Sequence, residues 1–110
     1  MALSFELTKS EKGEFYFKLL GADGSTLVRS EGYNAKASAT NGIESVRKNS
    51  TEDGRYELKT ASDGREFFNL KASNGQVIGT SPMFKDAAAR DGAVAEVKKG
   101  AGAAKLNDKS

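Results

Sequence analysis

The chain has 110 residues, neither Cys nor His, and 17 Lys and Arg against 15 Asp and Glu, for a formal net charge of +2. This is the length of one domain with a single core. The composition excludes disulfides, thiolate nucleophiles, the usual general base at neutral pH and the commonest metal ligands. Residues 98–110 carry four Lys and one Asp. The body is therefore near neutral, which argues against a nucleic-acid-binding body.

Three short strands are predicted at the start of the chain. Residues 5–8 alternate apolar and polar side chains, and residues 14–19 continue the alternation after a polar turn. Asp23 and Gly24 are residues that tolerate positive φ, so they predict a tight hairpin turn between this strand and a third one over residues 26–30.

After the third strand the apolar period changes from two residues to that of a helix. The stripe lies within residues 35–48 and consists of Ala39, Gly42, Ile43 and Val46. Asn34 is the expected N-cap, since Ala35 has no side-chain acceptor. Gly42 inside a helix costs stability relative to Ala, so we expect it where the helix and the sheet approach closely.

The same plan is then written a second time. An offset of 51 without gaps aligns residues 5–49 with residues 56–100, and the identical pairs include Glu6/Glu57, Leu7/Leu58, Phe17/Phe68, Leu19/Leu70 and Ser30/Ser81. The second copy predicts strands at 56–59, 66–70 and 77–80 and a turn at Asn74-Gly75. Its helix has Ala93, Val94 and Val97 on the apolar side and Asp86 as N-cap.

These elements predict an α+β fold. Two tandem βββα repeats, at residues 3–49 and 54–99, are expected to form one pseudo-twofold domain over residues 1–99, because two copies are too few for a solenoid. We expect an antiparallel sheet with both helices on one face. Residues 100–110 are rich in Gly, Ala and Lys and are expected to be a disordered basic tail. An isolated repeat is marginal at this size, and residues 1–54 are expected to self-associate more readily than residues 55–110.

The candidate binding residues follow from the strand alternation. Phe15, Phe17 and Leu19 share one face of their strand, so Tyr16 and Lys18 point to the other. Phe67 is the second-repeat counterpart of Tyr16, and Arg29 is expected beside Lys18. If the helices cover the Phe17 face, then Tyr16, Lys18, Arg29 and Phe67 are the candidates for a contact platform on the opposite face. The alternative is the ordinary partial exposure of sheet aromatics.

Several runs together resemble a known family. The run GIESVRKN occupies residues 42–49, and the run LKASNG occupies residues 70–75. With the paired aromatic strands, the sequence is similar, over residues 3–99, to the YegP-like family of small uncharacterised bacterial tandem-repeat proteins. The resemblance implies a repeated unit of three strands and a helix in one antiparallel sheet, and it implies no catalytic residues. The second copy departs from the pattern at residues 81–84 and 90–93.

The function expected from the sequence is that of a non-enzymatic binding or accessory module, contacting a protein partner through a sheet face or edge. The alternatives are a small-ligand protein or an enzyme using Lys, Tyr and carboxylates in a cleft between the repeats, or weak nucleic-acid binding through the basic tail. We expect no catalytic, cofactor-binding or metal-binding residues, and a monomer rather than a homo-oligomer. The start lacks a signal-peptide pattern and no apolar run is long enough to span a membrane, so we expect a cytoplasmic protein.

Overall fold

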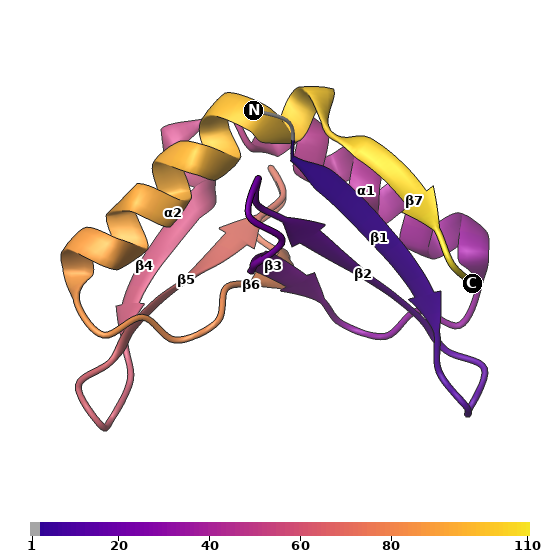
Figure 1. Cartoon of the computed structure of the whole chain (residues 1–110), viewed down its shortest axis with the longest axis horizontal. Helices are drawn as coiled ribbons and strands as arrows, with labels where there is room; N and C mark the ends of the chain where they lie inside the picture. The colour runs from indigo at the N-terminus through magenta and orange to yellow at the C-terminus, as the bar shows by residue number, and fades with distance from the viewer. Residues whose placement is uncertain (1–2) are drawn as a thin grey trace.

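The structure is a computed structural model that describes residues 3–110, so the first two residues of the predicted domain lie outside it. Figure 1 shows strands and helices in the order expected for two repeats. The elements are β1 (Ser4–Lys9), β2 (Phe15–Leu20), β3 (Thr26–Ser30), α1 (Lys36–Asn49), η1 (Asp53–Arg55), β4 (Tyr56–Thr60), β5 (Glu66–Lys71), β6 (Val77–Thr80), α2 (Ala87–Gly100), η2 (Ala101–Ala103) and β7 (Lys105–Asp108).

All seven strands belong to one sheet, in the order β4-β5-β6-β3-β2-β1-β7. The two repeats join at the centre, where β3 and β6 are antiparallel and Arg29 lies opposite Thr80. These two residues are counterparts under the offset of 51, so the pseudo-twofold axis passes through this pair. The halves of the sheet slope away from the centre in Figure 1, with α2 along the outer side of one slope. The predicted α+β fold of two tandem repeats is confirmed. Among the strands of residues 3–110, only β7 pairs in parallel, with β1.

The core lies between the sheet and the two helices. The predicted apolar positions of both helices are buried, together with Phe5, Leu7, Phe17 and Leu19 from the first repeat. Phe17 packs edge-on against Phe5 at 6.1 Å between ring centroids, and it stacks on Tyr33 at 6.2 Å. Such aromatic pairs add to the burial energy of the rings. No helix within residues 3–110 lies on the opposite face of the sheet (Figure 1).

Gly42 lies where the structure requires a glycine. A Cβ at this position would stand 2.6 Å from the Tyr33 Oη and 2.9 Å from the Phe17 Cε2, closer than a real Cβ approaches other atoms. The predicted close approach of helix and sheet is therefore confirmed. The predicted N-cap of α2 is confirmed, because Asp86 Oδ1 accepts the Ala89 N–H at 2.9 Å. The predicted N-cap of α1 is wrong: this helix begins after Ala35 with no side-chain cap, so Asn34 does not cap it.

Each of the two predicted hairpin turns contains one residue with positive φ, the glycine, whereas the sequence predicted positive φ for both turn residues. Gly24 and Gly75 have φ of 86° and 85°, but no non-glycine residue among those described has positive φ. Asp23 serves the turn through its side chain, because its Oδ1 accepts the Ser25 N–H at 3.0 Å. Asn74 accepts the Gln76 N–H in the same way. The acceptor role of these side chains explains why they are favoured here.

The prediction of a disordered tail at residues 100–110 is wrong. Residues 105–108 form β7, which places Leu106 opposite Phe5. The Lys109 N–H donates to the Leu7 carbonyl at 2.8 Å, and Ala101 and Ala104 are buried. The prediction considered only the apolar content of the tail. It left out the open backbone groups of β1, which a short polar segment satisfies as well as an apolar one does.

Candidate functional site

One row of side chains crosses the sheet on the face that has no helix. Successive cross-strand partners in the register share a face, so the row can be followed from strand to strand. From β1 through β2, β3, β6 and β5 to β4 it consists of Glu6, Lys18, Arg29, Thr80, Asn69 and Glu57. The pseudo-twofold axis divides this row into a first-repeat half and a second-repeat half.

The first-repeat half contains two cations side by side. Lys18 and Arg29 are directly opposite each other, and both are exposed. Among residues 3–110, no carboxylate forms an ion pair within 4.0 Å of either side chain. Glu6 is opposite Lys18 on the other side, but its Oε2 pairs with the Lys109 Nζ of the tail at 3.2 Å. Because like charges opposite each other destabilise a sheet, the stability of the fold does not explain why Lys18 and Arg29 are neighbours.

Tyr16 borders the cation pair on β2. Its hydroxyl donates to Glu14 Oε1 at 3.1 Å, and this contact with a carboxylate raises the pKa of the Tyr16 phenol. Gly32 leaves room for the ring, since a Cβ there would lie 3.0 Å from the Tyr16 Oη. The half-buried ring therefore has a fixed position on the uncovered face.

The second-repeat half of the row has neutral residues at the two equivalent positions, and they bind each other. The Thr80 hydroxyl donates to Asn69 Oδ1 at 2.7 Å, and Asn69 Nδ2 donates to Glu57 Oε1 at 3.0 Å. Lys71 pairs with Glu57 at 2.9 Å. The hydrogen bond from Asn69, and then that from Lys71, lower the pKa of Glu57. This half of the face is satisfied within the protein, whereas the first half is not.

The four predicted binding residues do not form one cluster. Tyr16, Lys18 and Arg29 lie together on β2 and β3. Phe67 is half-buried on β5, and β6 and β3 separate β5 from β2. At about 4.8 Å between neighbouring strands, the three strand spacings from β5 to β2 place Phe67 at least roughly 14 Å from Tyr16 and Lys18. The candidate site therefore consists of Tyr16, Lys18 and Arg29, here called the cationic face.

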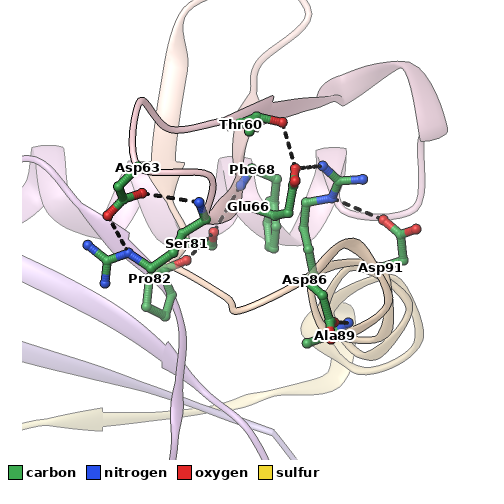
Figure 2. A network of polar contacts seen from close by, with 11 residues as sticks. Thr60, Asp63, Glu66, Phe68, Ser81, Pro82, Asp86, Ala89 and Asp91 are labelled. Carbon is green, nitrogen blue, oxygen red and sulfur yellow. Dashed lines mark hydrogen bonds and ion pairs between the residues drawn. The ribbon is translucent and has the colours of Figure 1, made fainter.

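A polar cluster in the second repeat was missed by the sequence reasoning. Figure 2 shows Glu66 accepting from Thr60 and from an arginine of α2. This arginine is Arg90, whose Nη1 lies 2.8 Å from Glu66 Oε1 and whose Nε lies 3.1 Å from Asp91 Oδ1. Phe15 is the counterpart of Glu66 in the first repeat and packs against the core, so the second repeat has an ion pair where the first has an apolar side chain. The signal was available, since Phe15/Glu66 and Ala39/Arg90 both change between the aligned copies.

The small-ligand alternative requires a cleft between the repeats, and residues of both repeats line several grooves, one of them beside α2. This groove has a volume of about 420 Å³ and is lined by Leu3, Ala22, Glu96, Lys99 and Gly100. Its carboxylate is directed at the chain itself, because Glu96 Oε2 lies 3.4 Å from the Ala22 amide nitrogen. Within residues 3–110, no three side chains of metal-binding types cluster. Likewise, no helix in this range is long and apolar enough to cross a membrane.

A family model described as a domain of unknown function, DUF1508, matches residues 10–57 and residues 61–108. The two matches are 51 residues apart, which is the offset that aligns the repeats. Each matched unit begins before the second strand of a repeat and ends in the strand after its helix. The end of the second match, in β7, therefore corresponds to the end of the first match, in β4. Residues 105–108 are thus part of the second repeat unit as the family model defines it.

Similar proteins are found in several bacteria. The chain is 51% identical to the UPF0339 protein YegP of Shigella flexneri over 98 residues, 89% of each chain. It is 46% identical to a UPF0339 protein of Pseudomonas aeruginosa over the whole of both chains. A solution NMR structure of a UPF0339 protein from Shewanella oneidensis has a TM-score of 0.93 at 40% identity, covering 98% of this chain and 92% of the other. The solution NMR structure of the protein of unknown function yegP from Escherichia coli has a TM-score of 0.92 at 46% identity. The match covers 99% of this chain and 94% of the other.

Proposed function

Because the chain belongs to the YegP-like UPF0339 family, whose repeat is a domain of unknown function, we propose its role from its own surface: a non-enzymatic binding module for an acidic protein segment. The absence of His and Cys from the sequence supports the non-enzymatic part of the proposal. The cysteine-free composition also supports a place in the cytoplasm.

The observation that carries the proposal is the uncompensated pair of cations on the cationic face. Lys18 and Arg29 are opposite each other without an ion-pair partner in residues 3–110, although the same two positions in the second repeat hold neutral, hydrogen-bonded residues. A carboxylate of a partner placed between them would accept charge-assisted hydrogen bonds from both and would remove their repulsion.

The shape of the cationic face favours an extended protein segment as the partner. The strands β2 and β3 present alternate side chains at a spacing of about 7 Å, which matches the alternate side chains of another extended chain. Tyr16 lies at one end of the cation pair and offers an apolar ring with a polar tip, a combination that is enriched at protein interfaces. The partner segment therefore combines a carboxylate with an apolar residue that covers the Tyr16 ring.

The test is site-specific photo-crosslinking in cells that make the protein naturally. A photoreactive amino acid replaces Tyr16 in one variant and the exposed Lys48 of α1 in a matched control. We expect a protein that crosslinks from position 16 and not from position 48, and whose yield falls when Lys18 and Arg29 are both changed to Glu. Equal crosslinking from both positions would contradict the proposal, as would a yield that is insensitive to the charge reversal.

The same experiment separates a protein partner from a nucleic acid. The basic-tail alternative predicts crosslinks to RNA or DNA that nuclease treatment removes. It also predicts that neutralising Lys105 and Lys109 reduces the yield. We expect nuclease-resistant protein adducts; nuclease-sensitive adducts would instead favour the alternative.

A further inference from the structure

The two outer strands of the repeats are covered differently. β1 and β4 are pseudo-twofold counterparts, and β7 covers the outer edge of β1. No strand within residues 3–110 lies beyond β4. Leu7 of β1 and Leu58 of β4 occupy equivalent positions, but Leu7 is 0% exposed and Leu58 is 51% exposed. An uncovered strand edge with an exposed leucine is a site for pairing with another strand.

The backbone of β4 is oriented to accept a strand. The Leu7 carbonyl of β1 points outward and accepts from the Lys109 N–H, and the Leu3 carbonyl, just before β1, accepts from the Lys105 N–H. The same register relates β1 to β2 and β4 to β5, with Leu7 opposite Phe17 and Leu58 opposite Phe68. The offset of 51 therefore places the amide and carbonyl of Leu58 at the open edge.

A groove runs beside this edge on the helix side. It is lined by Leu58 of β4 and by Asp91, Val94, Ala95 and Lys98 of α2, and it has a volume of about 290 Å³. In Figure 1, α2 and β4 follow the same slope of the molecule in opposite directions. A partner that pairs with the edge would therefore also lie beside α2.

The charged residues of the open β4 edge are arranged symmetrically about Leu58. On β4, Glu57 and Lys59 flank Leu58 at equal distances along the strand, on the other face of the sheet. A twofold axis through Leu58 would place Glu57 of one copy opposite Lys59 of the other in a closely spaced pair. Glu57 keeps its contacts with Asn69 and Lys71, and Lys59, which lies 3.9 Å from Glu57 of its own chain, gains a second carboxylate across the axis.

The helix layer has the same symmetry about the same axis. Asp91 and Lys98 are equally far along α2 from Val94 and Ala95, all of which line the groove. In the antiparallel arrangement, Asp91 of one copy faces Lys98 of the other. Asp91 now pairs with Arg90 and Lys98 with Asp53, and Asp91 and Asp53 are the exposed members of these pairs. Arg90 would keep its half-buried partner Glu66 if Asp91 changed partner.

We propose that the occupant of the β4 edge is a second copy of this chain. β4 pairs antiparallel with β4 of the second copy about a twofold axis at Leu58, so the two exposed leucines cover each other and one sheet continues through both copies. A partner of different sequence would need its own complement to these charges, whereas a second copy carries it. The cationic face lies in the other half of each sheet and stays open, so this inference does not rest on the proposed function.

The junction between the repeats is consistent with the monomer expected from the sequence. The second repeat completes the sheet at β3 and β6, so no second copy is needed there. The β4 edge lies at the end of the sheet, away from this junction, and the second repeat leaves it open. Two five-residue strands with their flanking helices bury less than about 1,200 Å² in total, so the dimer is weak, with a dissociation constant on the order of 100 µM.

The test is sedimentation of the full chain between about 10 and 1,000 µM, a range that spans this constant. We expect a monomer at the low end and a dimer at the high end. Lys59→Glu places Glu opposite Glu, and Glu57→Lys places Lys opposite Lys, so each variant alone should remain monomeric. An equimolar mixture of the two restores complementary charges and should form a heterodimer. Circular dichroism checks that each variant is folded.

A control with the same change of charge uses the first hairpin. Lys12→Glu alters an exposed residue far from β4 and should leave dimerisation unchanged. A monomer at every concentration would overturn the proposal. A dimer that persists in Lys59→Glu, or variants that fail to associate when mixed, would also overturn it, because pairing would then not place residue 57 opposite residue 59.

Discussion

Gly42 is the residue on which the contact between α1 and the sheet depends most directly. Tyr33 and Phe17 occupy the space where its side chain would be, and both rings belong to the aromatic stack of the first repeat. Gly92 of α2 is a useful contrast, because it lies in a helix of the same length and nothing stands within 4 Å of its Cβ position. Two helical glycines thus differ only in their surroundings.

Gly42→Ala should destabilise the protein by about 1–3 kcal/mol, because the added methyl overpacks against the two rings. Gly92→Ala, the matched control, should stabilise it by up to about 1 kcal/mol through helix propensity. Urea denaturation of both variants measures the difference. Stabilisation by Gly42→Ala would mean that the rings move aside freely and that the close approach is not structurally required.

The strand β7 shows how an element can be missed from sequence. The helices and the first six strands were predictable because their apolar periodicity is intrinsic to each segment, as in the stripe ending at Val46 and the alternation around Phe17. β7 has a single large apolar residue, Leu106, and what orders it is the edge of a strand one hundred residues earlier. A long-range ladder of backbone hydrogen bonds leaves no periodic pattern in the segment that completes it.

Removing residues 104–110 should lower the thermal midpoint by at least about 5 °C. The deletion uncovers the edge of β1 and exposes Phe5 and Leu7, a loss of about 1 kcal/mol or more. Calorimetry of the truncated chain measures the change. A midpoint within about 2 °C of the full chain would show that β7 adds nothing to stability.

The contact between β7 and α1 should also be visible in a titration. The hydrogen bond from Lys36, and then those from Ser110, lower the pKa of Asp108 to about 2. Because the folded-state pKa is depressed, the contribution of this pair is present above the ordinary carboxyl pKa of about 4 and is lost as the pH falls toward 2. In Lys36→Ala the pKa of Asp108 should rise toward its ordinary value, as carbon-13 NMR of the carboxyl group would record. Identical titration curves in both proteins would contradict the ion pair.

At the scale of the whole molecule, the two repeats have become complementary rather than interchangeable. Arg29 is opposite Thr80 at the central junction, and a Cβ at Gly79 would collide with Val28. A homodimer of the first repeat through this junction would place Arg29 opposite Arg29 and Val28 where Gly79 belongs. These contacts argue against the expectation that residues 1–54 self-associate more readily than residues 55–110, which stays a prediction for the isolated fragments.

Fragments 1–54 and 55–110 should each fail to fold as a stable monomer and should fold together as a one-to-one complex when mixed. The reason is that a single repeat buries too little surface, while the mixture restores the Arg29–Thr80 junction. Circular dichroism and sedimentation of the separate and mixed fragments decide this. A folded homodimer of 1–54 would show that the junction tolerates Val28 in place of Gly79.

The candidate site was only partly predictable for a related reason. Strand alternation placed Tyr16, Lys18 and Phe67 on the correct face, because alternation is a local property. Strand order is not a local property of the sequence. Phe67 is separated from Tyr16 and Lys18 because β6 and β3 lie between β5 and β2. The lack of an ion-pair partner for Lys18 depends on Lys109 binding Glu6, a contact between the two ends of the chain.

The central claim is that Lys18 and Arg29 are present for a partner and not for the fold. The most direct measurement uses the partner protein that the crosslinker at position 16 captures. Its affinity is measured for the wild type and for the double variant Lys18→Asn/Arg29→Thr, which has the second-repeat residues at these two positions. We predict affinity reduced by about tenfold or more, from the loss of two charge-assisted contacts, with thermal stability equal to or above that of the wild type. Unchanged affinity in a folded variant would contradict the account.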